Sequence, residues 1–148
     1  MSFSFRGQDL SFLIPTIYAL TPEGCTIYII SPWLNITTPL AIPWSDKNEE
    51  ISFYDFVVSE RMRGVASVFY VSDMANNEHE TQESIKKLNS GGFKVEVLRN
   101  LHSKAVIGST LMYQGSANIT RRGLYTNKEN VVLSHIDDQG IVLRRMLS

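Results

Sequence analysis

The spacing of hydrophobic residues along the chain predicts alternating helices and strands. Short runs of branched apolar residues, each bounded by polar or turn-forming positions, predict strands at 26–31, 64–72 and 93–98. Apolar residues at helical spacing predict helices at about 50–63 and 78–89, the second ended by Gly91 and Gly92, and one at about 9–19 with a break at Pro15. Such an alternation is typical of neighbouring parallel strands joined by crossover helices.

The pattern changes after Leu98. Two short apolar runs, 104–107 and 110–114, flank Gly108 and Ser109, which predicts an antiparallel hairpin with a type II′ turn and glycine at its first central position. A short helix, a strand and a final helix are then expected at about 119–125, 130–134 and 138–146. We therefore expect one α/β domain spanning 1–148, with a mixed sheet flanked by helices.

The segment 32–48 fits neither pattern. It contains three prolines and two tryptophans, Trp33 and Trp44, lacks periodicity, and is longer than a usual connection. The sequence leaves open whether it is a functional loop or a packing arm. For the two tryptophans it favours a core or interface position over a base-stacking one.

The composition narrows the class of protein. With 43% hydrophobic and 20% charged residues and a net charge of -1, the chain is expected to be a soluble globular domain. No apolar run reaches the roughly 20 residues needed to span a bilayer. One cysteine, Cys25, and three scattered histidines provide neither an internal disulfide nor zinc-ligand spacing. We expect a cytoplasmic protein without a metal site, a secretory signal or a stable membrane association.

The charge is unevenly distributed along the chain. Residues 94–148 contain eight Lys and Arg against four Asp and Glu, a net charge of +4, which leaves -5 for the first 93 residues. The basic part is the part that carries the candidate chemistry. This distribution suits an anionic substrate.

The candidate chemistry lies within residues 101–133. Residues two apart on a strand face the same side, so His102 and Lys104 are expected to project together and place an imidazole beside an ammonium. Ser116 and Asn118 share a face by the same rule and offer a hydroxyl and an amide to anionic oxygens. A helix that starts just after Asn118 would add backbone N–H donors. The segment therefore predicts a phosphate-handling site.

These residues resemble the motif of the phospholipase D superfamily, in which H-x-K is followed by G-S-x-N and then by N-x-E. In this chain the motif residues are His102, Lys104, Gly115, Ser116, Asn118, Asn127 and Glu129. The chain looks most similar to the small bacterial endonucleases of that superfamily, which carry one motif per chain. It departs from the family pattern at Ser109, where an aspartate is usual, and the spacing from the lysine to the G-S pair is one residue shorter. We expect a tight turn at Gly108 and Ser109 to place the departure at a hairpin tip, away from the phosphate.

The resemblance implies a phosphodiesterase that uses no metal or cofactor and forms a covalent phosphohistidine. His102 of one subunit would attack phosphorus, and the partner subunit's His102 would protonate the leaving oxygen. Lys104 and Asn118 would hold the non-bridging oxygens with help from Ser116, and Glu129 would accept a hydrogen bond from His102. Because one chain carries one motif, the resemblance implies a homodimer with its active site on the two-fold axis.

The expected activity is cleavage of DNA or RNA by a homodimeric endonuclease. Candidate substrate contacts are Gly115, Arg121, Arg122 and Asn127, although the two arginines fit a solvated helix face equally well. Two other functions fit the same motif. One is a phospholipase D-type lipid phosphodiesterase; the other is a nucleic-acid-binding subunit of a bacterial defence or DNA-modification complex, which the modest net charge favours.

Overall fold

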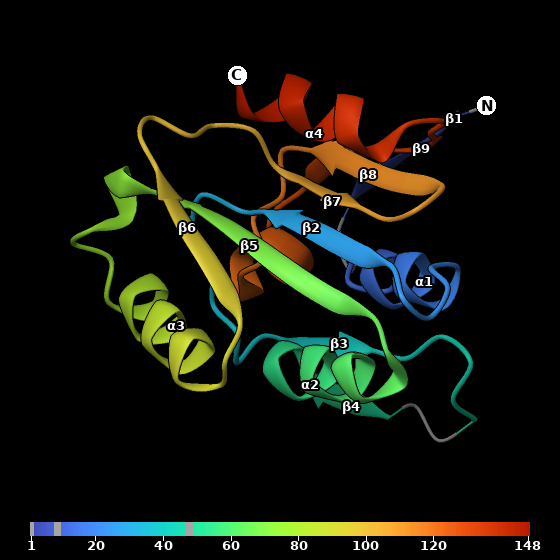
Figure 1. The fold of residues 1–148 in the computed structure, drawn as a ribbon, viewed down its shortest axis with the longest axis horizontal. Helices are drawn as coiled ribbons and strands as arrows, with labels where there is room; N and C mark the ends of the chain where they lie inside the picture. The colour runs from blue at the N-terminus through green and yellow to red at the C-terminus, as the bar shows by residue number, and fades with distance from the viewer. Residues whose placement is uncertain (1, 8–9, 47–48) are drawn as a thin grey trace.

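A seven-stranded mixed sheet crosses the computed structural model, which describes residues 2–7, 10–46 and 49–148 (Figure 1). In spatial order the strands are β1 (Ser2–Gly7), β9 (Glu129–His135), β8 (Leu111–Gly115), β7 (Ala105–Ile107), β2 (Thr26–Ile30), β5 (Ala66–Ser72) and β6 (Lys94–Leu98). Strands β2, β5 and β6 are parallel, and every other neighbouring pair is antiparallel. The expected α/β class with a mixed sheet is confirmed.

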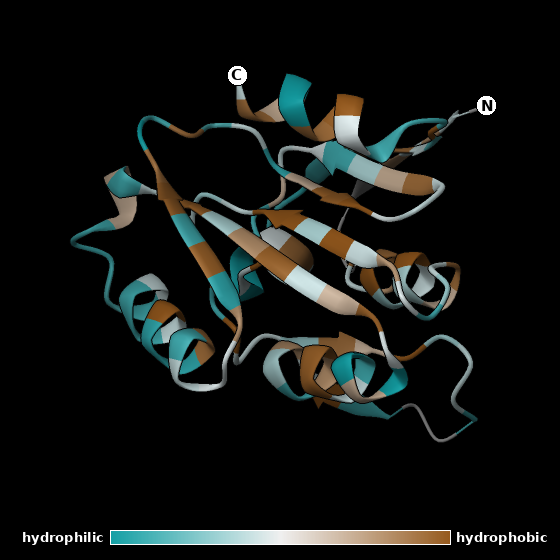
Figure 2. Cartoon of the chain, viewed as in Figure 1, coloured by the Kyte–Doolittle hydropathy of each residue, from teal (hydrophilic) through white to brown (hydrophobic). Residues whose placement is uncertain are grey.

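The two faces of the sheet pack against different helices. On one face Ile29, Phe69 and Val106 belong to the larger hydrophobic core, which α1 (Leu13–Ala19), α2 (Phe53–Arg63) and α3 (His79–Ser90) cover. On the other face, neighbours such as Ile30 and Tyr70 pack beneath α4 (Gln139–Leu147). The edge strand β6 differs, because Figure 2 shows hydrophilic and hydrophobic residues alternating along it. Because adjacent strand residues point to opposite faces, apolar runs can serve both cores.

The segment 32–48 contributes a strand to the packing. Residues Pro39–Ala41 form β3, which pairs antiparallel with β4 (Glu50–Ser52), and Leu40 is fully buried. The predicted helix at 50–63 therefore begins later, at Phe53, where the Ser52 hydroxyl accepts the Asp55 N–H at 3.1 Å. The segment is a packing arm over these residues, while positions 47–48 lie outside the described residues.

The first helix has no break at Pro15. It begins at Leu13, so Pro15 lies in its first turn, where a missing N–H removes no intrahelical hydrogen bond. The predicted start near Asp9 lies outside the described residues. A strand that we did not predict, β1, pairs with β9 at the edge of the sheet.

The predicted type II′ turn is wrong. Gly108 does not have a positive φ, and its N–H donates to the Leu111 carbonyl at 2.8 Å, so the central turn residues are Ser109 and Thr110. Glycine is needed here for space, because an added Cβ would lie 2.8 Å from the Ile17 Cγ2 of α1. Ser109 nevertheless lies at the hairpin tip, at the far end of β7 from His102.

The remaining predicted elements agree closely with the structure. The third helix ends at Gly91 and Gly92, of which Gly92 has a φ of +83°. Two short helical turns, η1 (Asp73–Ala75) and η2 (Arg122–Thr126), complete the chain, and η2 is π-helical rather than α-helical. In the part of the chain that the structure describes, no helix combines the length and the apolar character needed to cross a bilayer.

Candidate active site

The sheet brings the motif residues to one of its ends. His102 and Lys104 immediately precede β7, Ser116 and Asn118 follow β8, and Glu129 begins β9. Because β7 runs antiparallel to β8, and β8 to β9, these positions meet at the same end of the three strands. The carboxyl end of β2 lies there too, since Ile30 pairs with Ala105. Ligands of open α/β sheets usually bind outside the carboxyl ends of the parallel strands.

His102 and Lys104 line one open hollow of about 340 Å³. The His102 side chain is exposed to solvent, and Met146 of α4 lies on the rim. The Lys104 ammonium donates to the His102 carbonyl oxygen at 3.0 Å, and the Lys104 carbonyl accepts the Gly115 N–H at 3.1 Å. An imidazole and an ammonium are thus available to one anionic ligand.

Ser116 connects the ends of β8 and β9. Its hydroxyl donates to a carboxylate oxygen of Glu129 and accepts the Asn130 N–H at 3.0 Å, while its own N–H donates to the Asn130 carbonyl at 3.0 Å. The predicted hydrogen bond between Glu129 and His102 stays a prediction for the dimer. Within the described ranges of a single chain, Glu129 binds Ser116 and not the ring of His102. The reason is the strand order: β8 lies between β7 and β9, so roughly two strand spacings, about 10 Å, separate the two backbones.

Asn118 is held in place by Ser31 and Trp33, two residues that were not predicted to belong to the site. Its side-chain oxygen accepts the Trp33 N–H at 3.1 Å, and the Ser31 hydroxyl accepts the N–H of the next residue, Ile119, at 2.9 Å. The side-chain oxygen Oδ1 of Asn118 already accepts a hydrogen bond from Trp33, so the side-chain NH₂ group is the part that can donate to an anion. Gly123 also packs against the Asn118 backbone, where an added Cβ would overlap the carbonyl oxygen.

One of the residues that hold Asn118 in place, Gly123, could have been recognised from the sequence. Gly123 falls inside a predicted helix, where glycine is unfavourable and therefore suggests a close contact. Ser31 and Trp33 gave no such signal, because their hydrogen bonds span 88 and 85 residues of the sequence.

The other predicted substrate contacts lie in three places. Gly115 lines the hollow of His102, but it also lies against β9, where an added Cβ would come within 2.7 Å of the Val131 Cα. Arg121 and Arg122 are exposed and line a second hollow, of about 740 Å³, together with Trp33. The Asn127 N–H donates to the Arg122 carbonyl at 2.8 Å and closes the π-helical turn. Such turns are frequent at functional sites.

The described residues contain no cluster of metal-ligating side chains. No group of three or more His, Cys, Asp or Glu side chains in them is arranged to hold an ion. The charged groups that surround the hollow of His102 are instead those of the motif itself.

Comparison with known proteins matches residues 2–142 to the family described as "Cardiolipin synthase, PLD-like domain". No curated protein sequence matches the chain. Among solved structures, Nuc from Salmonella typhimurium, described as a phospholipase D family member, is similar with a TM-score of 0.69 and 15% identity, over 99% of this chain and 89% of Nuc. NucT from Helicobacter pylori is similar with a TM-score of 0.65 and 15% identity, over 98% of this chain and 90% of NucT.

A third solved structure is TrmBL2, an archaeal chromatin protein described as showing a novel mode of DNA binding. It is similar with a TM-score of 0.54 and 14% identity, over 98% of this chain and 49% of that protein. At these identities the three structures show a shared fold.

Proposed function

This chain belongs to the phospholipase D-like family, and from that membership we propose that it is a nuclease that cleaves DNA or RNA phosphodiesters as a homodimer. The observation that carries the proposal is the exposed His102 beside Lys104 at one end of the sheet, in a chain with one such pair. The fold shared with Nuc and NucT, over 89% and 90% of those chains, supports the proposal.

The proposed cycle uses two histidines, one as nucleophile and one as proton donor. A ring nitrogen of neutral His102 attacks phosphorus, the bond to the leaving oxygen breaks, and the partner subunit's His102, protonated, donates its proton to that oxygen. Water then attacks the phosphohistidine and gives its proton to the partner's His102, and the N–P bond breaks. Both imidazoles return to their starting states, so no metal or cofactor enters the proposed cycle.

The remaining motif residues stabilise and position the reacting groups. We assign the non-bridging oxygens to the Lys104 ammonium and the Asn118 amide, since both are donors at the site's edge. The Ser116 hydroxyl is bound to Glu129, which makes this pair a support for the end of β8 and β9. The family also includes lipid enzymes, as its description names cardiolipin synthase, so a lipid phosphodiesterase is the second candidate.

The test compares three substrates in the presence of a chelator: labelled DNA, labelled RNA and phosphatidylcholine vesicles. We expect cleavage of nucleic acid, and we expect His102→Ala to reduce it by about a thousandfold or more while the circular dichroism spectrum stays unchanged, because the side chain is exposed. His135→Ala removes another exposed histidine outside the motif and should leave turnover unchanged.

Each remaining outcome selects another function. Cleavage of the lipid alone would reject the nuclease and favour the second candidate. Binding of nucleic acid without cleavage of any substrate would favour a subunit of a larger defence or DNA-modification complex.

A further inference from the structure

Trp33 is held beside the motif but leaves its side chain half in solvent. The backbone N–H of Trp33 donates to the Asn118 side chain at 3.1 Å, and its backbone carbonyl accepts the Ser31 hydroxyl. The next residue, Leu34, is 1% exposed. Trp33 itself remains 48% exposed. A fixed backbone with an exposed indole excludes the core position, one of the two expected alternatives, and leaves the indole able to contact another molecule.

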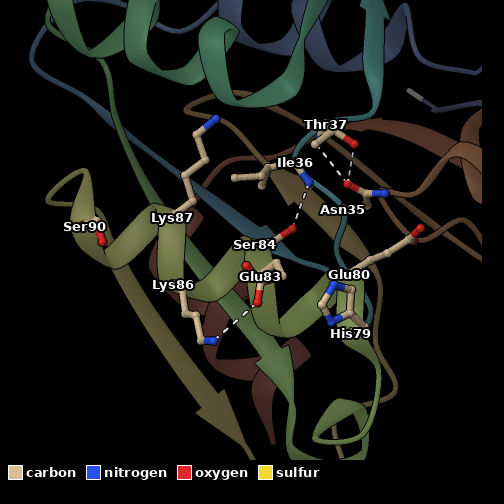
Figure 3. Close-up of a pocket in the computed structure, with 10 residues that line it drawn as sticks. All are labelled: Asn35, Ile36, Thr37, His79, Glu80, Glu83, Ser84, Lys86, Lys87 and Ser90. Carbon is tan, nitrogen blue, oxygen red and sulfur yellow. Dashed lines mark hydrogen bonds and ion pairs between the residues drawn. The ribbon is translucent and has the colours of Figure 1, made fainter.

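The exposed indole lies in a groove that leads away from Asn118. The 740 Å³ hollow of Trp33, Arg121 and Arg122 lies next to another hollow, of about 520 Å³, over α3. The two hollows share the lining residues Asn35, Thr37, His79 and Glu80. The two hollows therefore adjoin each other, and together they are called the groove here. Figure 3 shows the hollow over α3, where Lys86 turns toward Glu83 and Lys87 projects from the helix in another direction.

The charges along the groove are mixed, and most of the acidic groups are already bound. The Glu78 carboxylate accepts the N–H groups of Glu80 and Thr81 at the start of α3, and Glu83 pairs with Lys86 at 3.3 Å. Among the described residues, no carboxylate pairs with Arg121 or Arg122. Two cations beside the motif are therefore available to phosphate, and the exposed Glu80 is the carboxylate that opposes it.

We propose that Trp33 stacks on an unpaired base of a single-stranded nucleic acid, while Arg121 and Arg122 hold the phosphate of that nucleotide next to Asn118. An aromatic face beside cations is the usual arrangement for single strands, since every base offers a face for stacking. A duplex keeps its bases stacked on one another and offers none to the indole. The inference rests on the proposed nuclease function and adds the strand state of its substrate.

The second tryptophan supplies a matched control. Trp44 is 57% exposed and lines a different hollow, with Ile51, Phe56 and Arg63. In a His102→Ala background that prevents cleavage, Trp44→Phe leaves Trp33 as the single fluorescent indole, and Trp33→Phe leaves Trp44. We expect oligothymidylate to quench the emission of Trp33 and not of Trp44, and a blunt duplex to quench neither. Trp33→Ala should weaken binding of oligothymidylate about tenfold, whereas Trp33→Phe should retain most of it.

The outcomes separate this inference from the function on which it rests. If the wild-type protein cleaves nucleic acid but Trp33 is not quenched, or is quenched equally by the duplex, stacking is wrong and the nuclease proposal stands. If no nucleic acid is bound or cleaved, both are wrong. A blue shift of Trp33 emission with phosphatidylglycerol vesicles, without quenching by oligothymidylate, would mean that this surface meets lipid and would overturn the inference.

Discussion

Gly123 lies so close to the backbone of Asn118 that a side chain at this position has no room. The Thr120 hydroxyl accepts the Gly123 N–H at 3.0 Å, and the Thr120 N–H donates to the Asn118 carbonyl at 2.9 Å. The turn after the motif is thereby folded back onto the residue that we assign to the anionic oxygens. A glycine without any reactive group is thus a positioning residue.

Gly123→Ala should therefore damage activity as well as stability. The added methyl must displace backbone atoms, which we expect to cost about 1–3 kcal/mol in the free energy of unfolding. Because the displaced atoms belong to Asn118, kcat should fall in the fraction of protein that remains folded. Urea denaturation followed by steady-state kinetics under folding conditions measures the two effects separately.

Gly140→Ala is the matched control for this prediction. An added Cβ at Gly140 would lie 3.4 Å from the nearest atom, a side-chain oxygen of Asp138, so the site has room. Alanine in place of glycine in a helix should stabilise the protein by about 0.5–1 kcal/mol and leave kcat unchanged. If Gly123→Ala lost stability but kept its full kcat, Asn118 would not be positioned by this contact.

At the scale of the elements, the sequence predicts what is locally periodic. Strands β2 and β5 were predicted because they are largely buried between two layers and mostly apolar, and β6 because its branched residues Val95 and Val97 alternate with polar ones. Strand β1 was not predicted: it lies at the sheet edge and pairs only with β9, more than a hundred residues away. Strand β3 begins with Pro39, a residue that argues against a strand unless the strand is an edge.

The site was predicted to a similar extent. The motif spacing predicted that His102, Lys104 and Ser116 share one site, and the structure places all three at one end of the sheet. The bond of Glu129 to Ser116 within one chain was not predicted, because the sequence does not give the strand order that inserts β8 between β7 and β9. Contacts between distant segments, such as Trp33 with Asn118, have no local periodicity to reveal them.

The hairpin of β7 and β8 carries motif residues at one end and packs against α1 at the other. An added Cβ at Gly108 would lie 2.8 Å from Ile17 Cγ2, 2.9 Å from the Leu111 carbonyl oxygen and 2.9 Å from the Thr21 hydroxyl. Gly108→Ala should therefore move the hairpin relative to α1 and cost about 1–3 kcal/mol in unfolding free energy, measured by urea denaturation.

Ser109→Ala provides the comparison for Gly108→Ala at the next position. The Ser109 hydroxyl oxygen is buried and has no hydrogen-bond partner among the described residues. Removing it should leave stability unchanged or raise it, because no bond is lost and a desolvated polar group disappears. Equal losses in the two variants would mean that the tip tolerates no change at all, and the steric argument for Gly108 would fail.

At the scale of the whole molecule, one chain provides one exposed His102 at one end of its sheet. The proposed chemistry needs a nucleophile on one side of phosphorus and a proton donor on the other. A two-fold axis through the site supplies both from identical chains, since the same surface is presented twice. The rate should then depend on pairs of subunits and not on single ones.

Mixing wild-type and His102→Ala subunits before assembly tests this dependence. With random pairing, the share of sites that contain two His102 side chains is the square of the wild-type share, so an equal mixture should retain about a quarter of the activity. Independent monomers would retain half. Cleavage rates across a series of mixtures, prepared by co-refolding, distinguish the squared dependence on the wild-type share from a linear one.

The same series with His135→Ala should stay level, because that exposed side chain lies outside the motif. A linear decline with His102→Ala would show that a single subunit completes the reaction, and the phosphohistidine cycle would then need its proton donor from the same chain.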